Sequence, residues 1–357
     1  MTVRILDKYL LREFLLPVVY CFDAFVMLYI VQDLLGRLGE FIQYHAKISQ
    51  VIGYYLIILP EALVVMLPIA LLLGLLFCLS NLGKNNELLA FRASGISNQR
   101  LAAPFLVAGV IAAVAVFVVE EAFVPTGKVR AETFKSELRG RGSRTIFNGF
   151  FYANSAQNRE WHIGQFNTRT RQLDFVEIHQ RKPDGTAQLD VFAKSALWTN
   201  SQWQFYDANV YDHTLPHDQL LQVVVTNFPA FSESPNRLAL EGREPEQLRT
   251  RELRQQIPQA TGKLLAAYKV ELDRRYAFPW ACLVVIWIGF PLGVHISRRG
   301  GALLGVGTGL VLVVAFFLLL NIALALGKGE RIPPAVAAWL PNAVFAGVGA
   351  VLLWRNR

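Results

Sequence analysis

The segment that decides the fold class is VIGYYLIILPEALVVMLPIALLLGLLFCLS, residues 51–80, in which Glu61 is the only charged side chain. A helix needs roughly 20 apolar residues to cross the hydrocarbon core of a bilayer. Pro60 and Pro68 interrupt the run, but proline is tolerated in spanning helices, and a tilted or kinked helix uses the extra length. The segment therefore predicts a membrane-spanning helix.

Five further apolar runs of spanning length lie on either side of this segment. The six predicted spans are Phe14–Leu35, Val51–Ser80, Leu101–Val124, Ala277–Ile296, Ala302–Leu326 and Ala335–Trp354. Of the 357 residues, 53% are hydrophobic and 17% are charged, and the mean hydropathy is +0.34. Because a soluble domain carries about 25% charged residues, the composition favours a polytopic membrane protein.

Lysine and arginine in the short loops predict the orientation, because cytoplasmic loops carry the excess of these residues. One set of loops and termini holds ten of them: Arg4, Lys8, Arg12, Lys84, Arg92, Arg100, Arg298, Arg299, Arg355 and Arg357. The opposite set holds four: Arg37, Lys47, Lys328 and Arg331. We therefore expect both termini in the cytoplasm and the central polar block on the opposite side of the membrane. The formal net charge of +8 is then no sign of a nucleic-acid partner.

The central block differs from the spans in its residue composition and pattern. A basic segment from Lys128 predicts an amphipathic helix that ends near Gly140. Short runs rich in aromatic and β-branched residues follow, as in the strands of a sandwich or a jelly roll. These runs are residues 145–153, 159–166, 172–180, 189–198, 201–211 and 219–228. Two helical stretches, Glu244–Gln256 and Lys263–Arg275, then lead into the fourth span.

The sequence thus predicts three parts: spans one to three over residues 1–124, a β domain with flanking helices over 125–274, and spans four to six over 275–357. The chain has no phosphate-binding loop, no H-E-x-x-H, no C-x-x-C and no G-x-S-x-G. We therefore expect no catalytic residue, metal site or cofactor of its own. His213 and His217 flank a proline, a pattern that favours a solvated loop over a metal site.

The most informative polar segment is the loop LGKNNELLAFRASGISNQR, residues 82–100, between the second and third spans. It predicts a short helix over Glu87–Ala93, with Asn85 or Asn86 as its cap and Gly95 as the glycine that ends it. Three apolar residues lie on this cytoplasmic element: Leu88, Leu89 and Phe91. Two interpretations stay open: the helix lies in a groove of a soluble partner, or it rests on the membrane surface.

Four segments together make the chain recognisable. They are ILDKYLLREFL at 5–15, LPIALLLGLL at 67–76, ELLAFRASGIS at 87–97 and YKVELDRRYAFPWACLVVIWIGFPLG at 268–293. From end to end the chain resembles the YjgP/YjgQ permease family, the LptF and LptG subunits of the lipopolysaccharide export ABC transporter. Its start, LDKY, and its length lean toward LptG.

The resemblance implies a membrane α-helical fold with six transmembrane helices, three on each side of an inserted periplasmic β-jellyroll domain. It implies a subunit that extracts lipopolysaccharide from the bacterial inner membrane and passes it to a periplasmic bridge. The implied partners are an LptB-like ATPase dimer, a paralogous six-helix permease, and LptC-like and LptA-like bridge proteins. ATP and Mg would be bound by the ATPase and not by this chain.

The resemblance also implies that the segment near 87–95 is the coupling helix that docks on the ATPase, with Glu87 facing a basic residue of that partner. The expected coupling residues are Glu87, Leu88, Leu89, Phe91, Arg92, Ser94 and Gly95. The family places basic residues near the outer end of the first helix, where lipid phosphates would bind. Only Arg37 fits here, and Asp33 and Glu40 flank it.

Five more polar residues need an explanation. Arg274 and Arg275 precede the fourth span, where they either hold anionic headgroups or anchor the helix end. Asp23, Glu61 and Asn321 fall within spans, and polar residues there are commonly functional or hydrogen-bond neighbouring helices. For Glu61 a solvated interfacial position is favoured. Two functions of other classes remain: an ion-coupled transporter of an amphiphile that uses Glu61 and Asp23, and a membrane-anchored scaffold whose β domain binds a partner.

Overall fold

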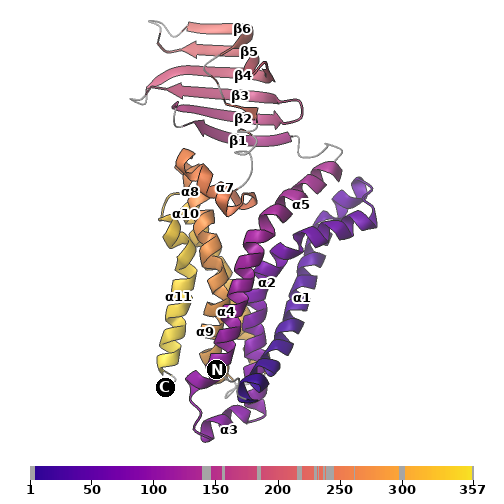
Figure 1. Ribbon diagram of the computed structural model, residues 1–357, viewed down its shortest axis with the longest axis vertical. Coiled ribbons are helices and arrows are strands. Elements are labelled where there is room, and N and C mark those ends of the chain that lie inside the picture. The colour runs from indigo at the N-terminus through magenta and orange to yellow at the C-terminus, as the bar shows by residue number, and fades with distance from the viewer. Residues whose placement is uncertain are drawn as a thin grey trace. The chain divides into compact units, whose positions relative to one another are not determined.

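The computed structural model (Figure 1) describes residues 5–138, 146–154, 157–182, 186–214, 219–228, 231, 233–235, 238, 245–260, 262–296 and 302–355. Several residues used above lie outside this set: Arg4, Gly140, His217, Glu244, Arg298, Arg299 and Arg357. The chain divides into two compact units. The membrane unit comprises Met1–Gly127 and Lys269–Arg357, and the β unit comprises Lys128–Tyr268.

The described residues contain six helices long and apolar enough to span a membrane, which confirms the predicted helical membrane fold. Five of these spans are α1 (Ile5–Gln43), α2 (Ile48–Lys84), α4 (Asn98–Ala122), α10 (Ala302–Lys328) and α11 (Pro334–Arg355). The fourth span in chain order is composite: it joins α8 (Gly262–Ala277), the 3-10 turn η3 (Phe278–Trp280) and α9 (Ala281–Ile296).

Helix α2 and the composite fourth span, which is 78% buried in its most apolar stretch, form the centre of the membrane unit. In the most apolar stretch of α2, 72% of the residues are buried, against 17% in α1 and 22% in α10. Neighbouring helices approach α2 closely at glycines: a Cβ on Gly74 would lie 2.5 Å from Val18 of α1, and one on Gly293 of α9 would lie 2.6 Å from Leu79. Because so little of α1 and α10 is buried, these outer helices have exposed apolar faces. Such faces are expected of helices that contact lipid.

The β unit contains an antiparallel sheet in which each strand pairs with its sequence neighbour. The strands are β1 (Ile146–Asn154), β2 (Arg159–Asn167), β3 (Gln172–Arg181), β4 (Ala187–Thr199), β5 (Gln202–Asp212) and β6 (Gln219–Asn227). All six predicted runs are strands. Within the described part of the chain they form one sheet, and the second sheet that a sandwich or jelly roll would add is not among these residues.

Four strands, β2 to β5, change their buried face at one level of this sheet. In β3 the buried residues are Leu173 and then Val176 and Ile178, so the two-residue alternation slips by one at Phe175. The same slip recurs in β2, β4 and β5, and the pairing register runs unchanged across it. The strand pairing skips one residue of each strand at this level, and we call these skipped residues the crease: Gly149, Gly164, Phe175, Lys194, Asp207 and Val224. Three of them, Gly149, Phe175 and Asp207, have φ between 50° and 57°.

Helical segments flank the sheet in sequence. The predicted amphipathic helix is α5 (Val124–Leu138), and the last predicted helix is α8. The prediction of one helix over Glu244–Gln256 is wrong in detail, because a 3-10 turn, η1 (Pro245–Gln247), precedes a separate helix, α7 (Thr250–Gln256). The backbone N–H of Arg249 donates to the Glu252 carboxylate at 2.8 Å. This contact satisfies an N–H at the helix start, so α7 begins anew at Thr250.

Candidate functional site: a coupling helix and two charged clusters

The short helix predicted over Glu87–Ala93 is present with these bounds, as α3. Asn86 occupies the cap position with φ of 58°, but its side chain makes no capping hydrogen bond. Gly95, with φ of +82°, follows the last turn, where glycine is favoured because it lacks a Cβ. The Ser94 hydroxyl donates to the carbonyl of Phe91 at 2.8 Å. The helix therefore has a well-defined end and a weakly capped start.

Side-chain contacts join α3 and the nearby helix ends. The Tyr9 hydroxyl of α1 donates to Glu87 at 2.6 Å. Arg92 donates to the side chain of Asn98, the first residue of α4, at 3.1 Å. An ion pair of 2.8 Å between Arg100 and Asp7 joins α4 to α1. Side-chain hydrogen bonds therefore connect α3 to both α1 and α4.

The apolar residues of α3 divide between two faces. Leu88 is 7% exposed and belongs to the core of the membrane unit, and Phe91 packs partly buried against that core. Leu89 is 66% exposed. Of the three apolar residues predicted for a partner or a membrane surface, only Leu89 thus points fully outward, and the other two hold the helix in place.

Arg37 lies in a polar neighbourhood of its own. Its guanidinium pairs with Asp33 one turn away at 2.8 Å and lies 5.8 Å from the ring centre of Tyr54 in α2. Tyr55 also donates to Asp33, at 3.2 Å. These residues adjoin an open hollow of about 410 Å³ that Arg37 and Asp33 line together with Glu40. The charge of Arg37 is therefore compensated, in keeping with the departure from a strongly basic cluster.

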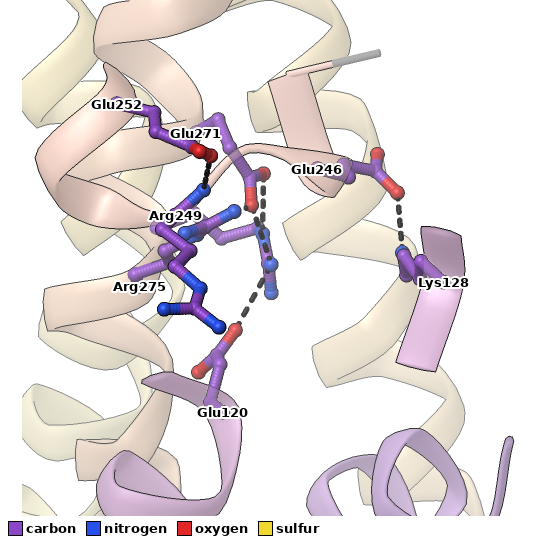
Figure 2. Close-up of polar contacts among 8 residues, drawn as sticks. Glu120, Lys128, Glu246, Arg249, Glu252, Glu271 and Arg275 are labelled. Carbon is purple, nitrogen blue, oxygen red and sulfur yellow. Dashed lines mark hydrogen bonds and ion pairs between the residues drawn. The ribbon is translucent and has the colours of Figure 1, made fainter. Parts of the chain in front are cut away.

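Arg275, Glu271 and Glu120, labelled in Figure 2, form a charged cluster with Arg274, whose side chain is 21% exposed. Arg274 donates twice to Glu271, both at 2.9 Å, and pairs with Glu120 of α4 at 2.9 Å. Arg275 donates to Glu271 at 3.0 Å. The exposed fractions are 1% for Glu271 and 3% for both Glu120 and Arg275. This geometry favours the helix-anchoring interpretation over the headgroup-binding one.

Sequence reasoning missed both glutamates as partners of these arginines. For Glu271 a signal was present, since residues three and four apart face one another on a helix, and Arg274 and Arg275 have these spacings. For Glu120 no local signal existed, because it lies on another helix. A further contact fixes the same region: the Asn342 amide of α11 donates to the carbonyl of Ala277 at 2.7 Å.

The three intramembrane polar residues do not gather into one site. Asp23 is exposed on α1, and Glu61 is half-buried in α2. Asn321 is exposed on α10 and donates to the carbonyl of Phe317 one turn earlier, at 2.8 Å. Its amide is therefore satisfied within its own helix, not by a neighbouring one.

The described residues contain no group of three or more potential metal ligands. His213 instead shares Asp190 with His179, at ring-nitrogen to oxygen distances of 3.0 Å and 2.8 Å. Burial alone would raise the pKa of the Asp190 carboxyl, but the hydrogen bonds from the two histidines outweigh it and hold that pKa below its usual value.

A family model described as lipopolysaccharide export system permease LptF/LptG matches residues 8–355. The chain belongs to this family. No curated protein matches it. The family is the permease of the lipopolysaccharide export system, a membrane transport component, and six apolar helices fit a multi-pass protein of the inner membrane.

Membership in the LptF/LptG family confirms the resemblance over nearly the whole chain. The match covers α3, the charged cluster of α8 and the β unit alike. One description serves both LptF and LptG, so the leaning toward LptG stays a prediction.

Proposed function

We propose that this LptF/LptG chain is one of two transmembrane subunits of an ATP-driven exporter that extracts lipopolysaccharide from the inner membrane. An LptB-like ATPase dimer binds ATP and Mg, and a paralogous six-helix permease completes the membrane part. The ten-to-four distribution of basic residues supports cytoplasmic termini, a cytoplasmic α3 and a periplasmic β unit.

The observation that carries this proposal is the two-sided construction of α3. Isolated helices this short are marginal in water, so tertiary contacts hold α3 together. Leu88 and the Tyr9–Glu87 hydrogen bond fasten one side to the membrane unit, and Leu89 is left exposed on the other. A partner that pushes on the exposed side moves α1 and α4 with it.

The apolar face of the β sheet supports a role in shielding acyl chains. Each exposed CH₂ of such a chain is unfavourable in water by about 0.8 kcal/mol. The described face is filled with side chains such as Trp161, Trp203 and Phe205, which Phe231 covers. Acyl chains would reach this face only by displacing that cover.

The last strand of the sheet supports a bridge contact. Among the residues that the structure describes, β6 ends the strand order and pairs with β5 alone. Val224 and Val225 on it are 74% and 51% exposed, although edge strands of soluble proteins usually carry charges or prolines that block pairing. We assign β6 to strand addition with an LptC-like domain, which passes the lipid on toward LptA-like proteins.

The test is Glu87→Arg with Tyr9→Phe as its matched control. Both variants remove the Tyr9–Glu87 hydrogen bond, but only the first reverses the charge offered to a basic residue of the ATPase. We expect Glu87→Arg to lose co-purification with the ATPase and lipopolysaccharide export, and Tyr9→Phe to keep both. Equal loss in the two variants would show that Glu87 acts only within the chain.

Two other outcomes would favour the alternative functions. Export without any co-purifying ATPase, abolished by Asp23→Asn or Glu61→Gln, would favour an ion-coupled transporter. Export retained after charged residues replace the apolar face of the sheet would favour a scaffold role for the β unit.

A further inference from the structure

A hollow of about 420 Å³ lies in the membrane unit between α4, α9 and α11. Both α4 and α11 pack on α9, and the hollow lies where their side chains leave a gap. Apolar residues from all three helices line it: Ala102, Leu106, Ile286, Phe290, Leu353 and Trp354. Among the described residues, no charged side chain lines it.

Two close helix contacts and two small side chains explain why this space stays open. A Cβ on Gly109 of α4 would lie 2.8 Å from Ile286, and a Cβ on Gly349 of α11 would lie 2.5 Å from Trp287. Both outer helices are therefore held directly against α9. Ala102 faces the space from α4 and Ala350 from α11, and these small residues leave it unfilled.

The position of the hollow limits what can occupy it. All three helices belong to membrane spans, so the neighbouring medium is the hydrocarbon of the bilayer. A further helix, 10–12 Å across, would fill 420 Å³ in about one turn, which is too little for another spanning segment. A single acyl chain is thin enough to enter, and it matches an apolar lining.

One end of the hollow is polar. Asn98 and Gln99, in the first turn of α4, line it there, and Arg92 of α3 donates to Asn98 at 3.1 Å. Phosphate groups bind well at helix N-termini, where N–H groups are unpaired and the helix dipole is positive. Trp354 is 74% exposed near the end of α11, and tryptophan is typical of the membrane–water boundary.

We propose that this hollow binds one acyl chain of a membrane phospholipid, with the lipid phosphate at the first turn of α4. The bound lipid touches Asn98 and, through it, Arg92 of α3. A lipid bound there would stabilise the connection between α3 and α4 that the Arg92–Asn98 hydrogen bond makes. The proposal rests on the membrane location of the helices and not on lipopolysaccharide export, so it stands or falls separately.

The test uses the full chain in nanodiscs that contain a phospholipid with a photoreactive diazirine near the end of one acyl chain. After irradiation, adducts are mapped by peptide mass spectrometry. We expect several-fold more adducts on α9 and α11 residues of the hollow than around Val311 and Leu318 of α10, which are 69% and 60% exposed. Equal labelling of both regions would overturn the proposal.

The matched pair of variants is Ala350→Trp, which fills the hollow, and Ala343→Trp, seven residues earlier on the same helix, exposed and outside the hollow. We expect the first to lower hollow adducts several-fold and the second to leave them unchanged. If Ala350→Trp does not fold, Leu106→Phe is the second filling variant. Undiminished adducts in a folded filling variant contradict the site.

Two competition arms identify the lipid. Added unlabelled phospholipid should lower the adducts in proportion to its share, and added lipopolysaccharide at equal share should not. Preferential displacement by lipopolysaccharide would assign the hollow to the exported lipid and overturn the phospholipid assignment.

Discussion

Both units of this permease bury an arginine against a glutamate, and they arrive at the pair in different ways. In the membrane unit, Arg275 and Glu271 are four residues apart on one helix, with side chains 4% and 1% exposed. In the β unit, Arg159 and Glu233 are 74 residues apart, with side chains 2% and 0% exposed. Helix spacing specifies the first pair, whereas the second exists only once the chain has returned across the sheet.

Because the two pairs differ in sequence separation, they connect different parts of the chain. Glu233 accepts both 3.0 Å bonds from Arg159, and Asn154 donates to it at 2.8 Å. The Trp203 indole donates to the Glu233 carbonyl at 2.7 Å, and Arg159 lies 4.0 Å from the ring centre of Phe231. The Arg159–Glu233 pair therefore fixes the segment around Phe231 and Glu233 on the apolar face of the sheet. The membrane pair fixes the end of its own helix and, through Arg274 and Glu120, one neighbour.

The largest effect is expected from Glu233→Ala, because it leaves Arg159 buried without its carboxylate. Breaking a buried ion pair from one side lowers the free energy of unfolding by about 3–5 kcal/mol. Hydrogen exchange of β2 and β3 amides in the full chain measures this loss. Glu177→Ala, at an exposed position on β3, is the control and should change protection little.

A double variant sharpens the same point. Arg159→Met with Glu233→Leu removes both charges, so we expect most of the lost protection to return. If the double variant is as unprotected as Glu233→Ala, specific hydrogen bonds and not the uncompensated charge dominate.

The second-largest effect is expected at the crease, where neighbouring residues of β3 differ sharply in burial. Val176 is 1% exposed, and its neighbour Phe175 is 69% exposed with φ of 54°. Val176→Asn should lower the free energy of unfolding by about 2–4 kcal/mol, since it loses apolar burial and buries an amide. Phe175→Asn should stay within about 1 kcal/mol of the parent, because asparagine tolerates positive φ. Equal losses, measured by hydrogen exchange of β3, would contradict the slip in alternation.

The local cluster should respond less. Glu271→Gln keeps one acceptor oxygen, and Arg274 retains Glu120, so we expect a loss of about 1.5–3 kcal/mol in the free energy of unfolding. Glu120→Gln affects a single 2.9 Å ion pair and should have a smaller effect. Thermal unfolding in detergent ranks the two variants. A larger loss for Glu120→Gln would show that the contact between helices, and not the helix spacing, dominates this cluster.

The smallest effect is expected at the partly exposed Asp190. Since its folded pKa lies below the usual value near 3.9, its contribution to stability is fully present above about pH 4 and is lost as the pH falls through the folded pKa. Asp190→Asn should therefore be less stable than the parent at pH 7, by about 0.2–1 kcal/mol. Below the folded pKa the two should converge. A constant difference from pH 7 to pH 3, followed by hydrogen exchange of β3 and β4, would contradict the role of the carboxylate charge.

Sequence patterns predicted much of the candidate site as well as the fold. The bounds of α3 followed from its polar start and from Gly95, because both act within one turn of the chain. The division of Leu88 inward and Leu89 outward did not follow, because it depends on where the core of the membrane unit lies. Arg274 and Arg275 were recognised as charged residues beside a span, but their pairing with Glu120 of another helix was not.

By itself the sequence determined the six spans, the inserted strands and the family, because hydropathy, strand composition and short motifs are properties of neighbouring residues. Only the tertiary structure decided which side of each element is buried and which distant residues meet. The slip at Phe175 reverses the faces of β3 without changing its composition, and Arg159 finds Glu233 only across the folded sheet. Such contacts join residues far apart in the chain, where no local periodicity records them.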